Sequence, residues 1–235
     1  MKLKTLKYFI LTAATALLAS CFPESDYMYN DTGMFTLAGP TKLVADTGDI
    51  YYITENNAGA VIPDTLKRVM ASCDVLEAVS GKQNEYNVRL NDFSGAVCKA
   101  PVPLHAADAA NVGTDGININ QAWISGGYLN LYVSYALYQG ATKDKHVINL
   151  VHDNIRSNSD TLYFEMHHNA HGDSPENTDI SLYDFVFGGR YASFPISDIL
   201  GTGKPVIHIE WDWYIGDEYS YTREKSTHSG NIPVL

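Results

Sequence analysis

Apolar and polar residues alternate along the second half of the chain, and this pattern constrains the fold more than any other feature. Between residues 128 and 138 every odd position is Leu, Val or Tyr, while the even positions include Tyr, Asn and Ser. Similar alternation recurs over residues 146–152, 161–168 and 206–215. A period of two residues is typical of a β-strand with one buried face. Because no long helix is expected between these strands, we predict antiparallel sheets packed as a sandwich.

The preceding part of the chain has shorter extended runs. Between residues 32 and 98, four or five such runs are separated by turn residues such as Gly39-Pro40 and Ser80-Gly81. So many strands in so short a stretch indicate a small barrel. We therefore predict an all-β protein with a barrel domain over 32–110, a β-sandwich over 111–221 and a loose polar tail over 222–235.

The N-terminus has the pattern of an export signal. Three lysines precede an apolar run of 11 residues, and Leu18-Ala19-Ser20-Cys21 follows. This run is too short to span a membrane, which requires about 20 apolar residues. The order of features is that of a bacterial lipoprotein signal, with a plain secretory signal and a chance cysteine as the alternative. We predict that residues 1–20 are removed, that Cys21 carries the lipid anchor, and that 21–31 form a tether.

The charge of the chain limits its partners. It has 27 acidic and 16 basic residues, a formal net charge of −11, and loses three lysines with the signal, which would leave −14. Such a surface repels phosphate groups, so we exclude nucleic acid as a main partner. The remaining partners are a membrane, which the protein would contact through the lipid, and a protein or a glycan.

Two cysteines, Cys73 and Cys98, remain if Cys21 is lipidated. In an oxidising compartment outside the cytoplasm, an even pair is compatible with a disulfide. The alternative is two buried thiols on neighbouring strands, and the choice depends on geometry that spacing does not supply.

The catalytic motifs for which we searched are absent from the sequence: a Gly-x-Ser-x-Gly elbow, a His-Glu-x-x-His metal site and a phosphate loop. We therefore predict no catalytic residue, no cofactor and no enzymatic activity.

Two groups of residues keep a catalytic alternative open. Glu165, His167 and His171 supply nitrogen and oxygen ligands for zinc or a similar metal, although a polar strand end has the same composition. Glu210 and Asp212 lie two residues apart on a strand face, about 6.8 Å, which is compatible with a glycoside hydrolase. Any acidic strand face has that spacing.

Three tyrosines form a candidate binding surface. Tyr128, Tyr132 and Tyr138 share one face of the strand 128–138. Exposed aromatic rings stack on sugars or on a protein partner. The alternative is that these rings pack beneath a loop or against the N-terminal domain.

Several segments together resemble the NigD-like lipoproteins. The run Ile117-Asn-Ile-Asn-Gln-Ala-Trp-Ile-Ser-Gly-Gly-Tyr-Leu-Asn-Leu131 is similar to that family's Trp-Ile-x-Gly-x-Tyr-Leu-Asn segment, and 146–151, 162–173 and 191–200 agree in order and spacing. The resemblance implies an N-terminal OB-like barrel and a C-terminal β-sandwich on an envelope lipoprotein of diderm bacteria. It also implies an immunity or accessory role beside a bacteriocin, and it carries over no catalytic residue.

From the residues and the resemblance together, we predict a lipid-anchored protein of the cell envelope, at the outer membrane, that binds a protein or a glycan. One alternative is a bacteriocin-associated immunity lipoprotein whose acidic surface neutralises a basic toxin. The others are a carbohydrate-binding lipoprotein and a metal-dependent hydrolase.

Overall fold

The computed structural model describes residues 26–138, 145–177, 179–201, 205–216 and 221–233. The signal segment 1–20 and Cys21 lie outside these residues, so signal removal and lipid attachment stay predictions. In the described part of the chain, no helix has the length and apolar character needed to cross a bilayer.

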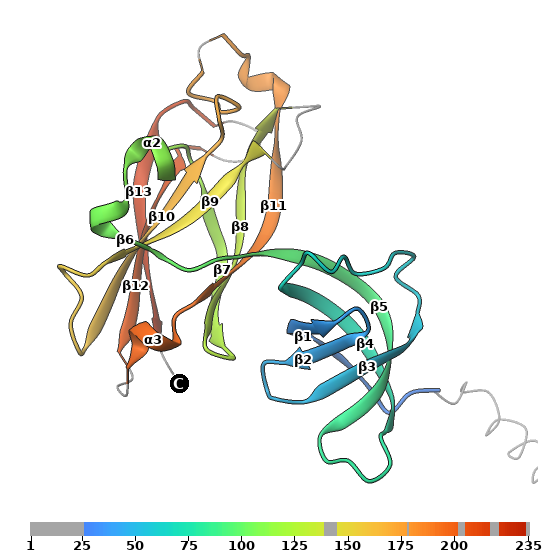
Figure 1. Ribbon diagram of the computed structural model, residues 1–235. Coiled ribbons are helices and arrows are strands. Elements are labelled where there is room, and N and C mark those ends of the chain that lie inside the picture. Colours follow the sequence, from blue (N-terminus) through green and yellow to red (C-terminus); the bar gives the residue numbers. More distant parts are fainter. Residues whose placement is uncertain (1–25, 139–144, 178, 202–204, 217–220, 234–235) are drawn as a thin grey trace, which may run out of the picture.

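Strands dominate the structure, and the few helices are short (Figure 1). In chain order, the elements are β1 (Tyr29–Gly39), β2 (Lys42–Ala45), β3 (Ile50–Asn56), β4 (Arg68–Ala78), β5 (Glu85–Cys98), β6 (Val102–Pro103), η1 (Leu104–Ala106), α2 (Ala109–Val112), β7 (Asn118–Ser125), β8 (Tyr128–Tyr138), β9 (Val147–Asp153), β10 (Thr161–Asn169), η3 (Leu182–Asp184), β11 (Phe185–Pro195), α3 (Ser197–Leu200), β12 (Val206–Tyr214) and β13 (Lys225–Pro233).

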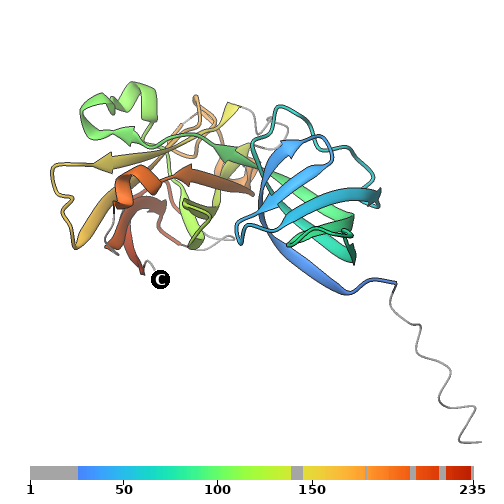
Figure 2. The same cartoon turned by 60° about the horizontal axis from the view of Figure 1, so that its bottom comes forward.

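The first five strands close into a barrel (Figures 1 and 2). β1 pairs antiparallel with β2 and β4, and the ring continues through β2–β3 and β4–β5. A parallel pairing of β3 with β5 completes it, so each strand has two neighbours. Phe35, Leu43, Tyr51, Val69 and Leu90 are among the buried residues that fill the interior. The predicted small barrel is confirmed.

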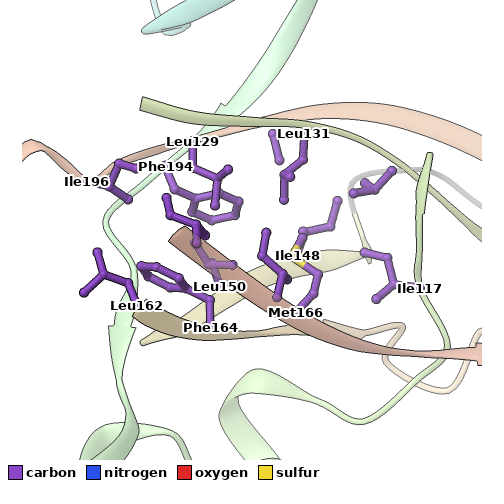
Figure 3. Close-up of a cluster of buried hydrophobic side chains, with 14 of the residues drawn as sticks. Ile117, Leu129, Leu131, Ile148, Leu150, Leu162, Phe164, Met166, Phe194 and Ile196 are labelled. Atoms are coloured by element: carbon purple, nitrogen blue, oxygen red, sulfur yellow. The ribbon is translucent and has the colours of Figure 1, made fainter. Parts of the chain in front are cut away.

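The second domain is a β-sandwich. One sheet contains β11, β8 and β7, and the other has the order β13-β12-β10-β9-β6. Figure 3 shows the core between them, where Leu131 and Phe194 of the first sheet face Leu150, Phe164 and Met166 of the second. The predicted sandwich is confirmed, with one difference. β10 and β12 run parallel, because the chain crosses to the other sheet through β11 before it returns.

β5 joins the two domains into one continuous sheet. Its last residues, 96–98, pair in parallel with residues 191–193 of β11. β6 already belongs to the sandwich, since it pairs with β9, and α2 packs on β9 and β10. The domain boundary therefore lies near residue 99, and the predicted boundary at 110 is too late.

The C-terminal segment is a strand, and the prediction of a loose tail over 222–235 is wrong for its described part. β13 pairs antiparallel with β12 along its whole length, from Lys225 opposite Tyr214 to Pro233 opposite Val206. Without β13, β12 would present a row of unpaired backbone groups at the sheet edge. Polar side chains suit such an edge strand, and Ile232 packs against the core.

Cys73 and Cys98 are free thiols, so of the two alternatives the disulfide is not formed. The register of β4 on β5 places Cys73 opposite Leu90. Cys98 is eight residues farther along β5, roughly 27 Å away at about 3.4 Å per residue. A disulfide requires a Cα–Cα distance below about 7 Å. The alternative of two thiols on neighbouring strands agrees with the structure, although Cys98 is only half-buried.

We expect thiol titration to count two free thiols in a Cys21→Ser chain unfolded in urea without reductant. In the folded chain Cys73 should not react, because burial raises the pKa of its thiol to about 12. A count near zero that reductant restores to two would contradict the β4–β5 register.

Candidate functional site

The outer face of the five-stranded sheet brings together two residue groups that were predicted separately. In the parallel pairing of β10 with β12, Glu165 lies opposite Glu210. Glu165 and His167 therefore lie beside Glu210 and Asp212, and all four line one hollow of about 240 Å³. We call it the acidic hollow, and its other walls are Thr114, Asp115, Met166, Trp211 and Thr227.

A short segment closes one end of the acidic hollow. Gly113 has a φ of +82°, and a Cβ at this position would lie 2.2 Å from the carbonyl oxygen of His168, so glycine is required there. The Gly113 carbonyl lies 3.0 Å from Nδ1 of His167, and the Asp115 N–H donates to the His168 carbonyl. These contacts hold Thr114 and Asp115 as the wall of the hollow.

Arg156 controls the electrostatics of the carboxylates. Its guanidinium donates to Glu210 Oε1 at 3.0 Å and Oε2 at 3.2 Å, and to Glu165 Oε1 at 3.2 Å. The hydrogen bonds from Arg156 hold the pKa of Glu210 below its usual value. A glycosidase acid needs a raised pKa and a proton to donate. Glu210 is instead ionised and doubly hydrogen-bonded, and Asp212 accepts from Thr227 at 2.7 Å. Glu210 is therefore not placed to act as the acid of a glycosidase.

The alternative metal group of Glu165, His167 and His171 does not assemble. His167 Nε2 lies 3.2 Å from Glu165 Oε2, but its other ring nitrogen faces the Gly113 carbonyl. His171 lies beyond the end of β10 in an exposed turn, with a φ of +50°. Across the described ranges, no three His, Cys, Asp or Glu side chains are arranged to hold a metal ion.

The three tyrosines do not form one exposed surface. The ring of Tyr128 covers the Arg68 guanidinium, whose carbon lies 4.0 Å from the ring centroid. Tyr132 packs on Tyr191, with 4.9 Å between the two ring centroids. Tyr138 is the exposed member, at 41%. Since Arg68 belongs to β4, Tyr128 packs against the barrel, as the alternative interpretation proposed. A binding role for this face has geometric support at Tyr138 alone.

Sequence reasoning missed a buried polar cluster where the two domains meet. Arg68 is fully buried, and its guanidinium donates to both oxygens of Asp46, at 2.6 and 2.8 Å. Its further acceptors are Thr36 in the barrel and Ser193 and Asn130 in the sandwich. Alternation along β4 gave no signal, because Arg68 shares the outward face of the strand with Met70, Ser72 and Asp74. The cluster ties the domains together.

A second missed cluster lies inside the sandwich. His146 Nδ1 lies 2.9 Å from His168 Nε2, and His146 Nε2 lies 3.0 Å from Asp173 Oδ2. His168 Nδ1 faces the Gly116 carbonyl at 3.1 Å, and Tyr135 packs against both imidazole rings. The position of His168 on the apolar face of its strand, beside Met166, was the available signal. Both clusters are enclosed and structural.

Residues 100–224, more than half of the chain, match the family model described as the NigD-like C-terminal beta sandwich domain. The chain belongs to the NigD-like family. The match begins directly after β5, in agreement with a domain boundary near residue 99, and it includes the carboxylates of the acidic hollow. None of the curated proteins matches this NigD-like chain.

Solved structures from Bacteroides species share the fold. A candidate lipoprotein from Bacteroides fragilis NCTC 9343 has a TM-score of 0.62 at 16% identity, over 88% of this chain and 99% of its own. A protein of unknown function from Bacteroides vulgatus ATCC 8482 has a TM-score of 0.58 at 20% identity, over 86% and 90%. A NigD-like immunity protein from Bacteroides caccae ATCC 43185 has a TM-score of 0.56 at 16% identity, over 86% and 94%. This coverage includes barrel and sandwich together.

Proposed function

We propose that this NigD-like protein is a lipid-anchored, non-enzymatic protein of the cell envelope that binds a basic protein through its acidic hollow. The observation that carries the proposal is the convergence of Asp115, Glu165, Glu210 and Asp212 on one concave surface, with Arg156 beside it. A net charge of −11, or −14 without the signal, extends this negative field over the molecule. Such complementarity accelerates association with a basic partner.

The geometry of the hollow favours binding over catalysis. Arg156 keeps Glu210 ionised, and His167 already has a contact at each ring nitrogen, so neither side chain is placed as a proton donor for a substrate. The proposed anchor is the lipid on Cys21 at the outer membrane. The likeness to a candidate lipoprotein from Bacteroides fragilis supports envelope attachment.

The proposed partner is a basic exported toxin. The support is the acidic surface together with the likeness to a protein described as a NigD-like immunity protein. A glycan is the second candidate partner for the protein as a whole, and a surface other than the acidic hollow favours it.

We expect deletion of the gene to sensitise cells to a toxin encoded beside it, and the wild-type gene to restore protection. A triple variant, Glu165→Gln, Glu210→Gln and Asp212→Asn, should restore little protection and should lower the association rate with that toxin by about tenfold or more at low salt. The wild-type rate should fall steeply with added salt, because the attraction is screened.

The matched control neutralises three exposed carboxylates of the barrel: Asp64→Asn, Glu77→Gln and Asp92→Asn. It removes the same charge from another surface and should still protect cells. Equal loss in both triple variants would indicate a dependence on net charge and contradict the acidic hollow as the binding site. Thermal unfolding of each variant checks that it is folded.

A further inference from the structure

A second hollow, of about 410 Å³, opens at the end of the sandwich between the turn 154–160 and α3. Its volume is within the range of about 300–1,000 Å³ that is usual for small-molecule sites. In Figure 3, Leu162, Phe164 and Ile196 mark this end of the core. We call it the α3 hollow, and its walls include His152, Asn154, Asn158, Leu162, Asp198 and Ile199.

His152 lines the α3 hollow and has an orphaned polar atom beneath the surface of that wall. Its Nε2 is buried and has no hydrogen-bond partner among the described residues. The imidazole stacks on Phe164 with 5.0 Å between centroids, and burial lowers its pKa, so the ring is neutral at pH 7. A buried polar atom without a partner is unfavourable, and in native proteins it often marks a functional position.

The turn on one side of the α3 hollow is rigid. Asp153 Oδ1 accepts from the N–H groups two and three residues later, both at 3.0 Å. Asn158 Oδ1 accepts in the same way from the N–H groups of Asp160 and Thr161, at 2.9 and 3.0 Å. The Asn158 Oδ1 is therefore committed to the turn, while its Nδ2 stays available as a donor to a ligand.

The other side of the α3 hollow is anchored equally well. Ile196, which precedes α3, is fully buried, and its N–H donates to the Gly127 carbonyl at 3.0 Å. The following residues place the exposed carboxylate of Asp198 and the half-buried Ile199 at the rim. No side-chain hydrogen bond within the described part of the chain occupies Asp198.

The chemistry of the lining selects one class of ligand. No lysine or arginine is among the described lining residues, and Asp198 repels anions. No metal-binding group of three side chains occurs in the described ranges. The imidazole, two carboxamides and one carboxylate offer both donors and acceptors, as sugar hydroxyl groups require, and Leu162 and Ile199 offer apolar contact to C–H groups. We propose that the α3 hollow binds a neutral saccharide unit, and that the His152 ring turns toward the hollow so that its Nε2 hydrogen-bonds to this unit.

Titration calorimetry with a panel of neutral methyl glycosides and oligosaccharides tests this proposal on the Cys21→Ser chain. At least one member should bind. His152→Phe keeps an aromatic ring on Phe164 but removes the nitrogen, and it should weaken binding by about tenfold or more. The control His208→Phe makes the same change on the outer sheet face, where His208 packs on Tyr163, and should leave the affinity unchanged.

Thermal unfolding provides an independent readout. Because His152→Phe removes an unpartnered polar atom, its melting temperature should equal or exceed that of the wild type, although it binds more weakly. Asp198→Ala, at an exposed position, is the second variant should His152→Phe not fold, and it should also weaken binding. Absence of binding by every neutral saccharide, binding of anionic saccharides alone, or full affinity in both variants would each overturn the proposal. Toxin protection is measured separately, so the proposal for the acidic hollow and the proposal for the α3 hollow can be refuted independently.

Discussion

Replacing Arg68 with alanine is expected to lower the free energy of unfolding by about 3–5 kcal/mol. The Arg68 guanidinium is fully buried and forms two hydrogen bonds with Asp46, whose side chain is itself 11% exposed. The variant would leave the Asp46 carboxylate with Ser125 as its remaining side-chain donor. It would also remove the donors to Ser193 and Asn130, which join the barrel to the sandwich. The main loss of stability therefore comes from the Asp46 carboxylate, which would stay largely buried without its charged partner.

Urea unfolding of wild type and variant, followed by tryptophan fluorescence, measures this loss. Arg89→Ala is the matched control, because Arg89 also contacts several carboxylates. Its two hydrogen-bonded partners, Asp26 and Glu55, are largely exposed, and the less exposed Asp74 lies 3.6 Å away. Exposed ion pairs contribute little, so the loss in the control should be much smaller. Arg68→Lys should recover only part of the stability, since lysine lacks the planar fork that contacts both Asp46 oxygens. Similar losses in Arg68→Ala and Arg89→Ala would contradict a structural role for the domain junction.

Lowering the pH from about 6.5 to about 4 is expected to destabilise the protein by roughly 3 kcal/mol through His168. Burial, followed by the charge of His146, lowers the pKa of His168 from 6.5 to about 4. In this window the unfolded chain binds a proton at His168 and the folded chain does not, so stability falls as the pH falls. Protonation of His168 while His146 carries a proton on Nδ1 would also place two N–H groups opposite each other across the 2.9 Å contact between the rings.

Urea unfolding at a series of pH values between 7.5 and 4 measures this dependence. His168→Gln removes the group with the large pKa shift and should make the dependence much shallower in that window, leaving the contribution of His152, whose pKa burial also lowers. The variant should be less stable at pH 7. His171→Gln, at an exposed turn position, should keep the wild-type slope. The carboxyl groups whose pKa is lowered, such as those of Glu210 and Asp153, have an ordinary pKa of about 4, so most of their effect lies at lower pH. A flat wild-type profile between pH 6.5 and 4 would show that His168 is not held neutral.

Local patterns predicted the strands well, because alternation depends only on which side chains favour a buried face. The predicted strand 128–138 has the bounds of β8. The polar segment that became β13 has no such alternation, so its strand character depends on the free edge of β12. Similarly, Tyr214 shares the alternation of Glu210 and Asp212 along β12, yet it is buried, and its hydroxyl donates to Glu176 at 2.7 Å.

The residues of the acidic hollow were visible in the sequence, but their association was not. Glu165 and Glu210 are 45 positions apart, and only the parallel pairing of β10 with β12 places them opposite each other. The α3 hollow depends even more on tertiary structure, since His152 and Asp198 come from distant segments with no shared motif.

The sequence by itself determined that this chain is an all-β protein with a small barrel and a sandwich, because strand period and turn residues are local properties. The tertiary structure alone decided where those domains divide, that Cys73 and Cys98 stay apart, and that Arg68 joins the two domains. These features depend on strand register and sheet order, which are set by contacts between residues far apart in the chain. The same contacts place four acidic side chains in one hollow and leave one histidine nitrogen without a partner.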